Sequence, residues 1–145
     1  LLSMDASYST LDTQTLLRNK GMKATPQRLA IAALLLTRPT HATAQQVCEL
    51  LNQDFPSISQ NTVYLTLANF EESGLLRRFC ADGKMIFDSN ITPHHHGLCK
   101  QCGKIEDISE THKIARPDAL QLWQVESETL TWAGVCPGCA DSTDL

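Results

Sequence analysis

Two C-x-x-C pairs constrain the fold of this chain more than any other feature. The first is Cys99–Cys102, the second is Cys136–Cys139, and residues 103–135 separate them. Two short turns of this kind can bring four thiolates to one tetrahedral ion, at about 2.3 Å from each sulfur. We therefore expect a structural Zn(II) on Cys99, Cys102, Cys136 and Cys139, and a small domain that folds only around it.

Two other roles of these cysteines fit less well. A pair of disulfides would need an oxidising compartment, and the start at Leu1-Leu2 lacks the basic region of a secretory signal. A redox C-x-x-C motif usually stands alone beside a βαβ pattern. These observations favour a zinc protein of the cytoplasm.

A second group of potential ligands has a different chemistry. His94 and His96 lie two residues apart, so in an extended segment both point to one side while His95 points to the other. Asp88 and Asp107 flank them, and His41 lies in a loop that could reach them. Imidazoles and carboxylates suit Fe(II), Mn(II) or Zn(II) in an open site. Each residue could instead be a surface charge or a capping group.

Charge is distributed unevenly along the 145 residues. The whole chain has a net charge of −4, but residues 1–88 are neutral and residues 89–145 carry the excess of acid. The first part can therefore present a local basic face to DNA more easily than the second. No apolar run approaches the ~20 residues that a membrane helix needs, so we expect no membrane partner.

Residues 1–88 carry the pattern of a winged helix-turn-helix domain. Helices are predicted over residues 9–20, from the Thr25-Pro26 cap, from the Thr43-x-x-Gln46 capping box, and over about residues 60–73 after the cap Ser59. Strands 75–81 and 84–88 follow, joined by Asp82-Gly83, a strong hairpin signal. The fourth helix would be the recognition helix.

Polar side chains on this recognition helix are the candidate contacts to double-stranded DNA. Amides and hydroxyls on the helix can read base edges or hold phosphates. The helix contains no Lys or Arg, which argues against tight binding by this element alone, and cations outside it could hold the DNA backbone. The alternative is a solvated polar face. The expected outward residues are Gln60, Asn61, Thr62, Tyr64 and Thr66, and the expected phosphate ligands are Arg77, Arg78, Lys23 and Arg28.

Residues 89–145 are predicted to form a small α+β domain held by zinc. It begins with the polar stretch 89–93. Strands are expected over residues 96–99 and 104–108, a helix over residues 115–123, and a last strand over residues 125–131.

Taken together, these motifs resemble those of the ferric uptake regulator superfamily of metal-dependent repressors, and the resemblance covers nearly the whole length of the chain. The matching segments are Ala24-Thr-Pro-Gln-Arg28, His41-Ala-Thr-Ala44, Ile58-Ser-x-x-Thr62-Val-Tyr64, Glu72-Ser-Gly-Leu75, His94-x-His96-x-x-Cys99-x-x-Cys102-Gly-Lys and Gly134-Val-Cys136-x-x-Cys139. The resemblance implies a homodimer with a DNA-binding winged helix, a dimerisation domain, a four-cysteine zinc, and a regulatory ion on His41, Asp88, His94, His96 and Asp107. It also implies that Tyr64 contacts DNA bases.

Two departures make the chain most similar to the peroxide-responsive branch, PerR. Asp107 stands where iron-sensing Fur proteins usually have Glu, and Pro93 and His95 interrupt the His-His-Asp-His run typical of Fur. A zinc-sensing Zur would be expected to place a cysteine in its sensory site, and Cys80 is poorly placed for that. The alternative is an iron- or zinc-responsive uptake regulator of the Fur or Zur type.

Two other classes of function remain open from the residues alone. A metalloenzyme could use an open His/Asp ion to activate water or peroxide, but the sequence has no separate nucleophile motif or cofactor loop, so we expect no enzyme. A zinc-held interaction module without a metal switch would keep its function when His94 or His96 is lost.

Overall fold

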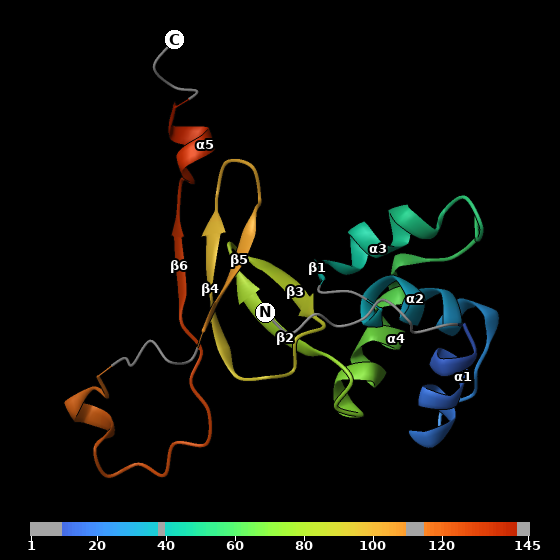
Figure 1. The fold of residues 1–145 in the computed structure, drawn as a ribbon, viewed down its shortest axis with the longest axis horizontal. Helices are drawn as coiled ribbons and strands as arrows, with labels where there is room; N and C mark the ends of the chain where they lie inside the picture. Colours follow the sequence, from blue (N-terminus) through green and yellow to red (C-terminus); the bar gives the residue numbers. More distant parts are fainter. Residues whose placement is uncertain (1–9, 38–39, 110–114, 142–145) are drawn as a thin grey trace. The chain divides into compact units, whose positions relative to one another are not determined.

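The computed structural model describes residues 10–37, 40–109 and 115–141 (Figure 1). The chain divides into two compact units, Leu1–Ile91 and Thr92–Leu145. Within the described residues, no helix has the length and hydropathy to cross a membrane.

The described part of the first unit contains four helices, and three of them start at the caps that the sequence predicted. They are α1 (Thr10–Asn19), α2 (Pro26–Leu36), α3 (Ala44–Leu51) and α4 (Gln60–Glu72). The Thr25 hydroxyl accepts the N–H of Arg28, and the Ser59 hydroxyl accepts the N–H of Thr62. At α3 the Thr43 and Gln46 side chains each accept the other's backbone N–H, which completes the predicted capping box. The predicted helices of residues 1–88 are confirmed.

A three-stranded sheet completes this unit, in the order β1-β3-β2. Its strands are β1 (His41–Ala42), β2 (Arg77–Ala81) and β3 (Lys84–Asp88), and all pairings are antiparallel. Asp82 and Gly83 take φ values of 52° and 71°, so the hairpin turn needs the left-handed conformation that such a pair tolerates. β2 begins later than predicted because the N–H of Leu75 donates to Phe70 O and still belongs to the end of α4. The two-residue β1 carried no sequence signal.

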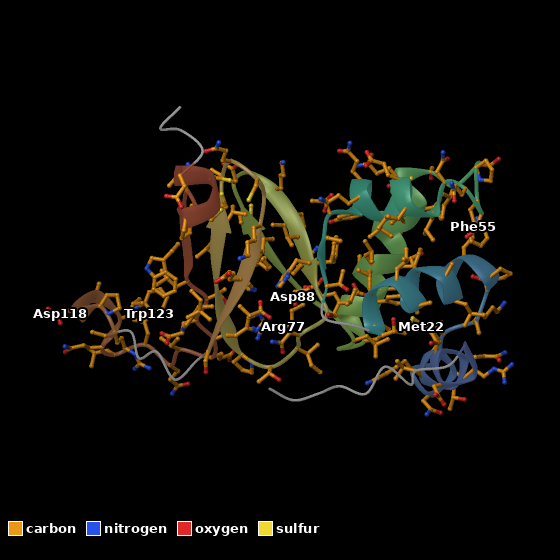
Figure 2. The ribbon with its side chains drawn as sticks, turned by 45° about the horizontal axis from the view of Figure 1, so that its top comes forward. Met22, Phe55, Arg77, Asp88, Asp118 and Trp123 are labelled. Atoms are coloured by element: carbon orange, nitrogen blue, oxygen red, sulfur yellow. The ribbon has the colours of Figure 1, made fainter. Side chains whose placement is uncertain are left out.

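The core of the first unit lies between the helices and β3. Its largest buried side chains include Leu17, Ile31, Leu35, Leu67, Phe70 and Phe87. Met22 and Phe55 pack at the edge of this core (Figure 2). The expectation that Thr66 points outward is wrong. Thr66 is 8% exposed and its hydroxyl donates to Thr62 O at 3.0 Å, because position 66 falls on the same inner stripe as Val63 and Phe70.

The second unit is a three-stranded sheet in the order β5-β4-β6. The strands are β4 (His94–Cys99), β5 (Ile105–Ser109) and β6 (Thr131–Gly134). β4 pairs antiparallel with β5 and parallel with β6. A 3-10 turn, η1 (Asp118–Leu120), and a short helix, α5 (Pro137–Ala140), complete the described part. The two strands predicted on either side of the first C-x-x-C pair are confirmed within two residues.

Two predictions for the second unit are wrong. The helix over residues 115–123 is reduced to η1. Leu122 and Trp123 are 99% and 66% exposed, and Figure 2 labels Trp123 near Asp118 of this turn. Nothing in the described chain covers an apolar face there, and Pro117 disfavours helical backbone in the residue before it. A last strand before Cys136 is present, but its predicted bounds are wrong: β6 covers residues 131–134 rather than 125–131, and its pairing with β4 begins at Thr131.

Candidate metal centres

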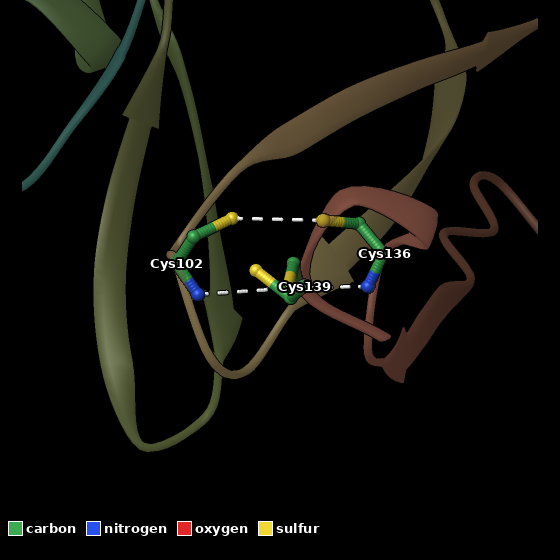
Figure 3. A group of neighbouring side chains, drawn as sticks. Cys102, Cys136 and Cys139 are labelled. Atoms are coloured by element: carbon green, nitrogen blue, oxygen red, sulfur yellow. Dashed lines mark hydrogen bonds between the residues drawn. The ribbon is translucent and has the colours of Figure 1, made fainter. Parts of the chain in front are cut away.

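Four cysteine sulfurs converge at one end of the second unit. Figure 3 labels three of these residues, Cys102, Cys136 and Cys139. Cys99 ends β4 and Cys102 lies in the turn that follows, where Gly103 has a φ of 76°. Cys136 and Cys139 form the second turn, at the start of α5. The four Sγ atoms all lie within 4.8 Å of one another, and the Cys102 and Cys136 sulfurs are 3.8 Å apart. Sulfurs at about 2.3 Å from a shared tetrahedral ion lie about 3.8 Å apart, so the geometry fits zinc.

The negative charges of four neighbouring thiolates favour binding of a cation. The backbone N–H groups of Cys102 and Cys136 donate to Cys99 Sγ at 3.5 and 3.3 Å, and they lower the pKa of that thiol to about 6. The neighbouring sulfurs of Cys136 and Cys102 raise the pKa of Cys139 to about 12. Four thiolates so close together repel one another unless a positive ion neutralises them. The cluster is therefore suited to Zn(II), which would hold all four sulfurs as thiolates.

A group of nitrogen and oxygen donors lies on the same sheet. His94 and His96 are buried on β4, and Asp107 faces them from β5, where it pairs with His96. Asp107 Oδ1 lies 3.2 Å from His94 Nε2 and 3.6 Å from His96 Nε2. The Nδ1 of His94 is 2.6 Å from Thr92 O, a carbonyl oxygen that accepts, and Nε2 is the ring nitrogen directed at Asp107. A divalent cation between Nε2 and the carboxylate would be held by both groups.

A second, smaller donor pair lies in the first unit. His41 on β1 pairs with Asp88 on β3, and His41 Nε2 lies 3.3 Å from Asp88 Oδ2. Asp88 is 1% exposed, and its other oxygen accepts the N–H of Asn90 at 2.8 Å. The ring of Phe79 meets the His41 ring edge to face. Hydrogen bonding of this kind fixes the orientation of a carboxylate ligand.

The Ferric uptake regulator family model matches residues 19–131. The chain belongs to the ferric uptake regulator family. It is 34% identical to the "Peroxide-responsive repressor PerR" of Staphylococcus saprophyticus, over 95% of this chain and 99% of that protein. It is 35% identical to the protein of the same name from Staphylococcus aureus, over 86% of this chain and 87% of that protein.

The fold agrees with this membership. The structure is similar to the crystal structure of the ferric uptake regulator (Fur) from Vibrio cholerae, with a TM-score of 0.66 and 26% identity, over 86% of this chain and 100% of that one. These relatives are named as a repressor and as a regulator. The resemblance inferred from the sequence motifs is confirmed.

One buried residue of this Fur-family chain has a role that the sequence did not reveal. His95 is 1% exposed and points away from His94 and His96, as strand alternation predicted. Its Nδ1 accepts the N–H of Leu130 at 3.1 Å, and its ring meets Trp132 edge to face. His95 therefore ties β4 to the segment that enters β6, the strand that leads to Cys136.

The expected DNA contacts in this Fur-family chain fall into two groups. Gln60, Asn61, Thr62 and Tyr64 are exposed on α4, whereas Thr66 is not. The arginines expected to hold DNA phosphates are only partly free of contacts within the chain. Arg28 donates from Nη1 to Lys23 O at 3.1 Å, and Arg77 is half-buried. Arg78, which was expected to hold phosphate, contacts Glu71 and Tyr64 within the chain.

Proposed function

We propose that this protein is a metal-dependent transcriptional repressor with a regulatory Fe(II) or Mn(II), and that it senses peroxide in its Fe(II) form. The observation that carries the proposal is the separation of two donor sets, one of thiolates and one of imidazoles and carboxylates. The first has the chemistry of a closed structural site, and the second has the chemistry of an open site for a divalent ion. The relatives named as peroxide-responsive repressors support the choice of signal.

The regulatory ion is proposed to join the two parts of the chain. His41 and Asp88 would supply ligands from the DNA-binding domain, residues 1–88, and His94, His96 and Asp107 from the dimerisation domain, residues 89–145. An ion shared in this way stabilises the closed arrangement only to the extent that it binds that arrangement more tightly than the open one. Metal binding would thereby favour the form that fits DNA.

DNA recognition is proposed for α4 and the wing of a homodimer. The exposed residues Gln60, Asn61, Thr62 and Tyr64 would face the major groove, and Arg77 and Arg28 would hold phosphates. A symmetric dimer of such domains binds two half-sites related by the same symmetry. The exposed Trp132 and Val135, at 41% and 54%, support a partner surface on the second unit. We place this regulator in the cytoplasm, with its DNA.

The peroxide signal is proposed to act on the ligands themselves. Fe(II) held by these residues would supply the redox chemistry that activates peroxide beside the imidazoles, without being consumed in the net reaction. The net change is the transfer of one oxygen atom from hydrogen peroxide to a ring carbon of His41 or His94, with release of water. The modified imidazole is a poor ligand, so the repressor would leave DNA. Oxidation of the zinc thiolates is the competing route.

A titration of DNA binding tests the proposal. The zinc-loaded protein is titrated with Mn(II), Fe(II) or added Zn(II), with and without mild peroxide, and its affinity for DNA is measured. The masses of the peptides that contain His41 and His94 are then determined by mass spectrometry. We expect both Fe(II) and Mn(II) to promote binding, and peroxide to abolish it only with Fe(II), with a gain of about 16 Da on a His41 or His94 peptide. Unmodified histidines with DNA binding retained would refute peroxide sensing and favour the Fur or Zur type. DNA binding that no metal changes would refute the repressor mechanism.

A further inference from the structure

The hydroxyl of Tyr64 is held by a side chain from the wing. Arg78 on β2 donates from Nη1 to Tyr64 Oη at 3.3 Å. The same guanidinium contacts Glu71 at the end of α4, with Arg78 Nε 3.0 Å from Glu71 Oε2. The planar fork of arginine can engage two partners at once, which the single ammonium of lysine does less well. Arg78 therefore links two residues of α4 to the wing.

The ring of Tyr64 is fixed by the neighbouring strand. Phe87 on β3 lies directly opposite Arg78 in the hairpin, and the Tyr64 and Phe87 rings meet edge to face with centroids 6.0 Å apart. One cross-strand pair thus contacts both ends of the tyrosine side chain, Phe87 at the ring and Arg78 at the hydroxyl. Tyr64 nevertheless remains 37% exposed, so part of it is free to meet a ligand.

These contacts determine what the tyrosine can offer. A phenol has one O–H donor and accepts through its lone pairs. Since Arg78 donates to the oxygen, the O–H remains available for an acceptor outside the chain, such as a base carbonyl or ring nitrogen in a DNA groove. A side chain ordered before binding also loses less conformational entropy on binding. Because Glu71 balances its charge, Arg78 is poorly suited to hold a phosphate.

We propose that Arg78 is a positioning residue for sequence recognition: it orients Tyr64 toward the bases instead of gripping the DNA backbone. This inference rests on the proposed DNA-binding function. It assigns specificity to a contact between the wing and α4, and it separates the roles of the adjacent residues Arg77 and Arg78.

A double-mutant cycle tests the proposal. The metal-loaded wild-type protein first selects a site from a random DNA library. The ratio of the Kd for random DNA to the Kd for the selected site is then measured for the wild type, Tyr64→Phe, Arg78→Gln and the double variant, over a range of salt concentrations. Arg77→Gln is the matched control, and the thermal unfolding midpoint of each variant confirms its fold.

The expected results differ for the two arginines. Tyr64→Phe and Arg78→Gln should each lower the ratio about tenfold, within the range of one good base contact. The double variant should lower it no further, because both changes remove the same contact. Arg77→Gln should weaken binding to both DNAs and reduce the salt slope by about one unit, as expected for a phosphate ligand.

Two results would overturn the positioning role while leaving the proposed function intact. In the first, the two losses add in the double variant, so that its ratio of Kd values falls about a hundredfold. The other is an Arg78→Gln variant that keeps the wild-type ratio and loses about one unit of salt slope. A wild-type protein that selects no DNA site would instead refute the proposed function itself.

Discussion

Removal of the four-cysteine zinc should unfold the second unit and leave the first folded. The perturbation is Cys99→Ser, which deletes the ligand whose sulfur accepts two backbone N–H groups, or Cys139→Ser, which deletes a ligand from the other turn. Either change leaves three thiolates, so the closed tetrahedral site is lost.

The expected magnitude follows from how few apolar side chains the second unit buries. Among its described residues, the buried hydrophobic ones are Leu98 and Cys99. Full burial of one leucine contributes about 1.5–3 kcal/mol, whereas a structural zinc contributes on the order of 10 kcal/mol. A typical domain has a net stability of about 5–15 kcal/mol. Loss of the ion therefore removes more free energy than the apolar contacts of this unit can replace. The first unit keeps its own core around Phe70 and Phe87.

Hydrogen exchange measured by mass spectrometry separates the two units. In the zinc-free variants, amides of β4 and β6 should lose their protection while those of α2 and α4 keep it, and sedimentation should show monomers. Cys80→Ser is the matched control, because Cys80 is an exposed cysteine outside the cluster. A metal-free Cys99→Ser variant that stays dimeric, with β4 and β6 protected, would refute the reasoning.

Three further predictions concern single side chains. Phe70→Ala should lower the free energy of unfolding of the first unit by about 3–5 kcal/mol in urea titrations, because Phe70 is fully buried. Leu65→Ala on the same helix is the control: its side chain is 54% exposed, so the free energy of unfolding should change by less than about 0.5 kcal/mol. His95→Leu should destabilise the second unit by about 1–3 kcal/mol because the N–H of Leu130 loses its acceptor. His95→Asn keeps an acceptor and should recover part of this loss, so equal thermal unfolding midpoints for the two variants would contradict the role of that hydrogen bond. His41→Ala should keep a normal zinc content and lose the stimulation of DNA binding by Mn(II); a full response would contradict an ion shared between the domains.

Local signals account for the parts of this protein that the sequence predicted well. The caps Thr25, Thr43 and Ser59 set the starts of three helices because a side chain and a nearby N–H satisfy each other within three residues. Each C-x-x-C turn brings its own two sulfurs together within four residues, whereas the parallel pairing of β4 with β6 brings the two turns together. Strand alternation placed His94 and His96 on one side of β4 and His95 on the other.

The tertiary structure decided what depends on partners distant in sequence. Thr66 looked like a surface hydroxyl, but its place on the inner stripe of α4 buries it, and its hydroxyl bonds to Thr62 O. The start of β6 depends on where β4 offers a pairing partner, and a helix over residues 115–123 lacks an apolar surface to cover it within the described chain. The sequence suggested only a phosphate contact for Arg78, whereas the folded hairpin places this residue opposite Phe87 and within hydrogen-bond distance of Tyr64. In each case composition and spacing specify what a residue can do, while its surroundings after folding select which of those interactions it makes.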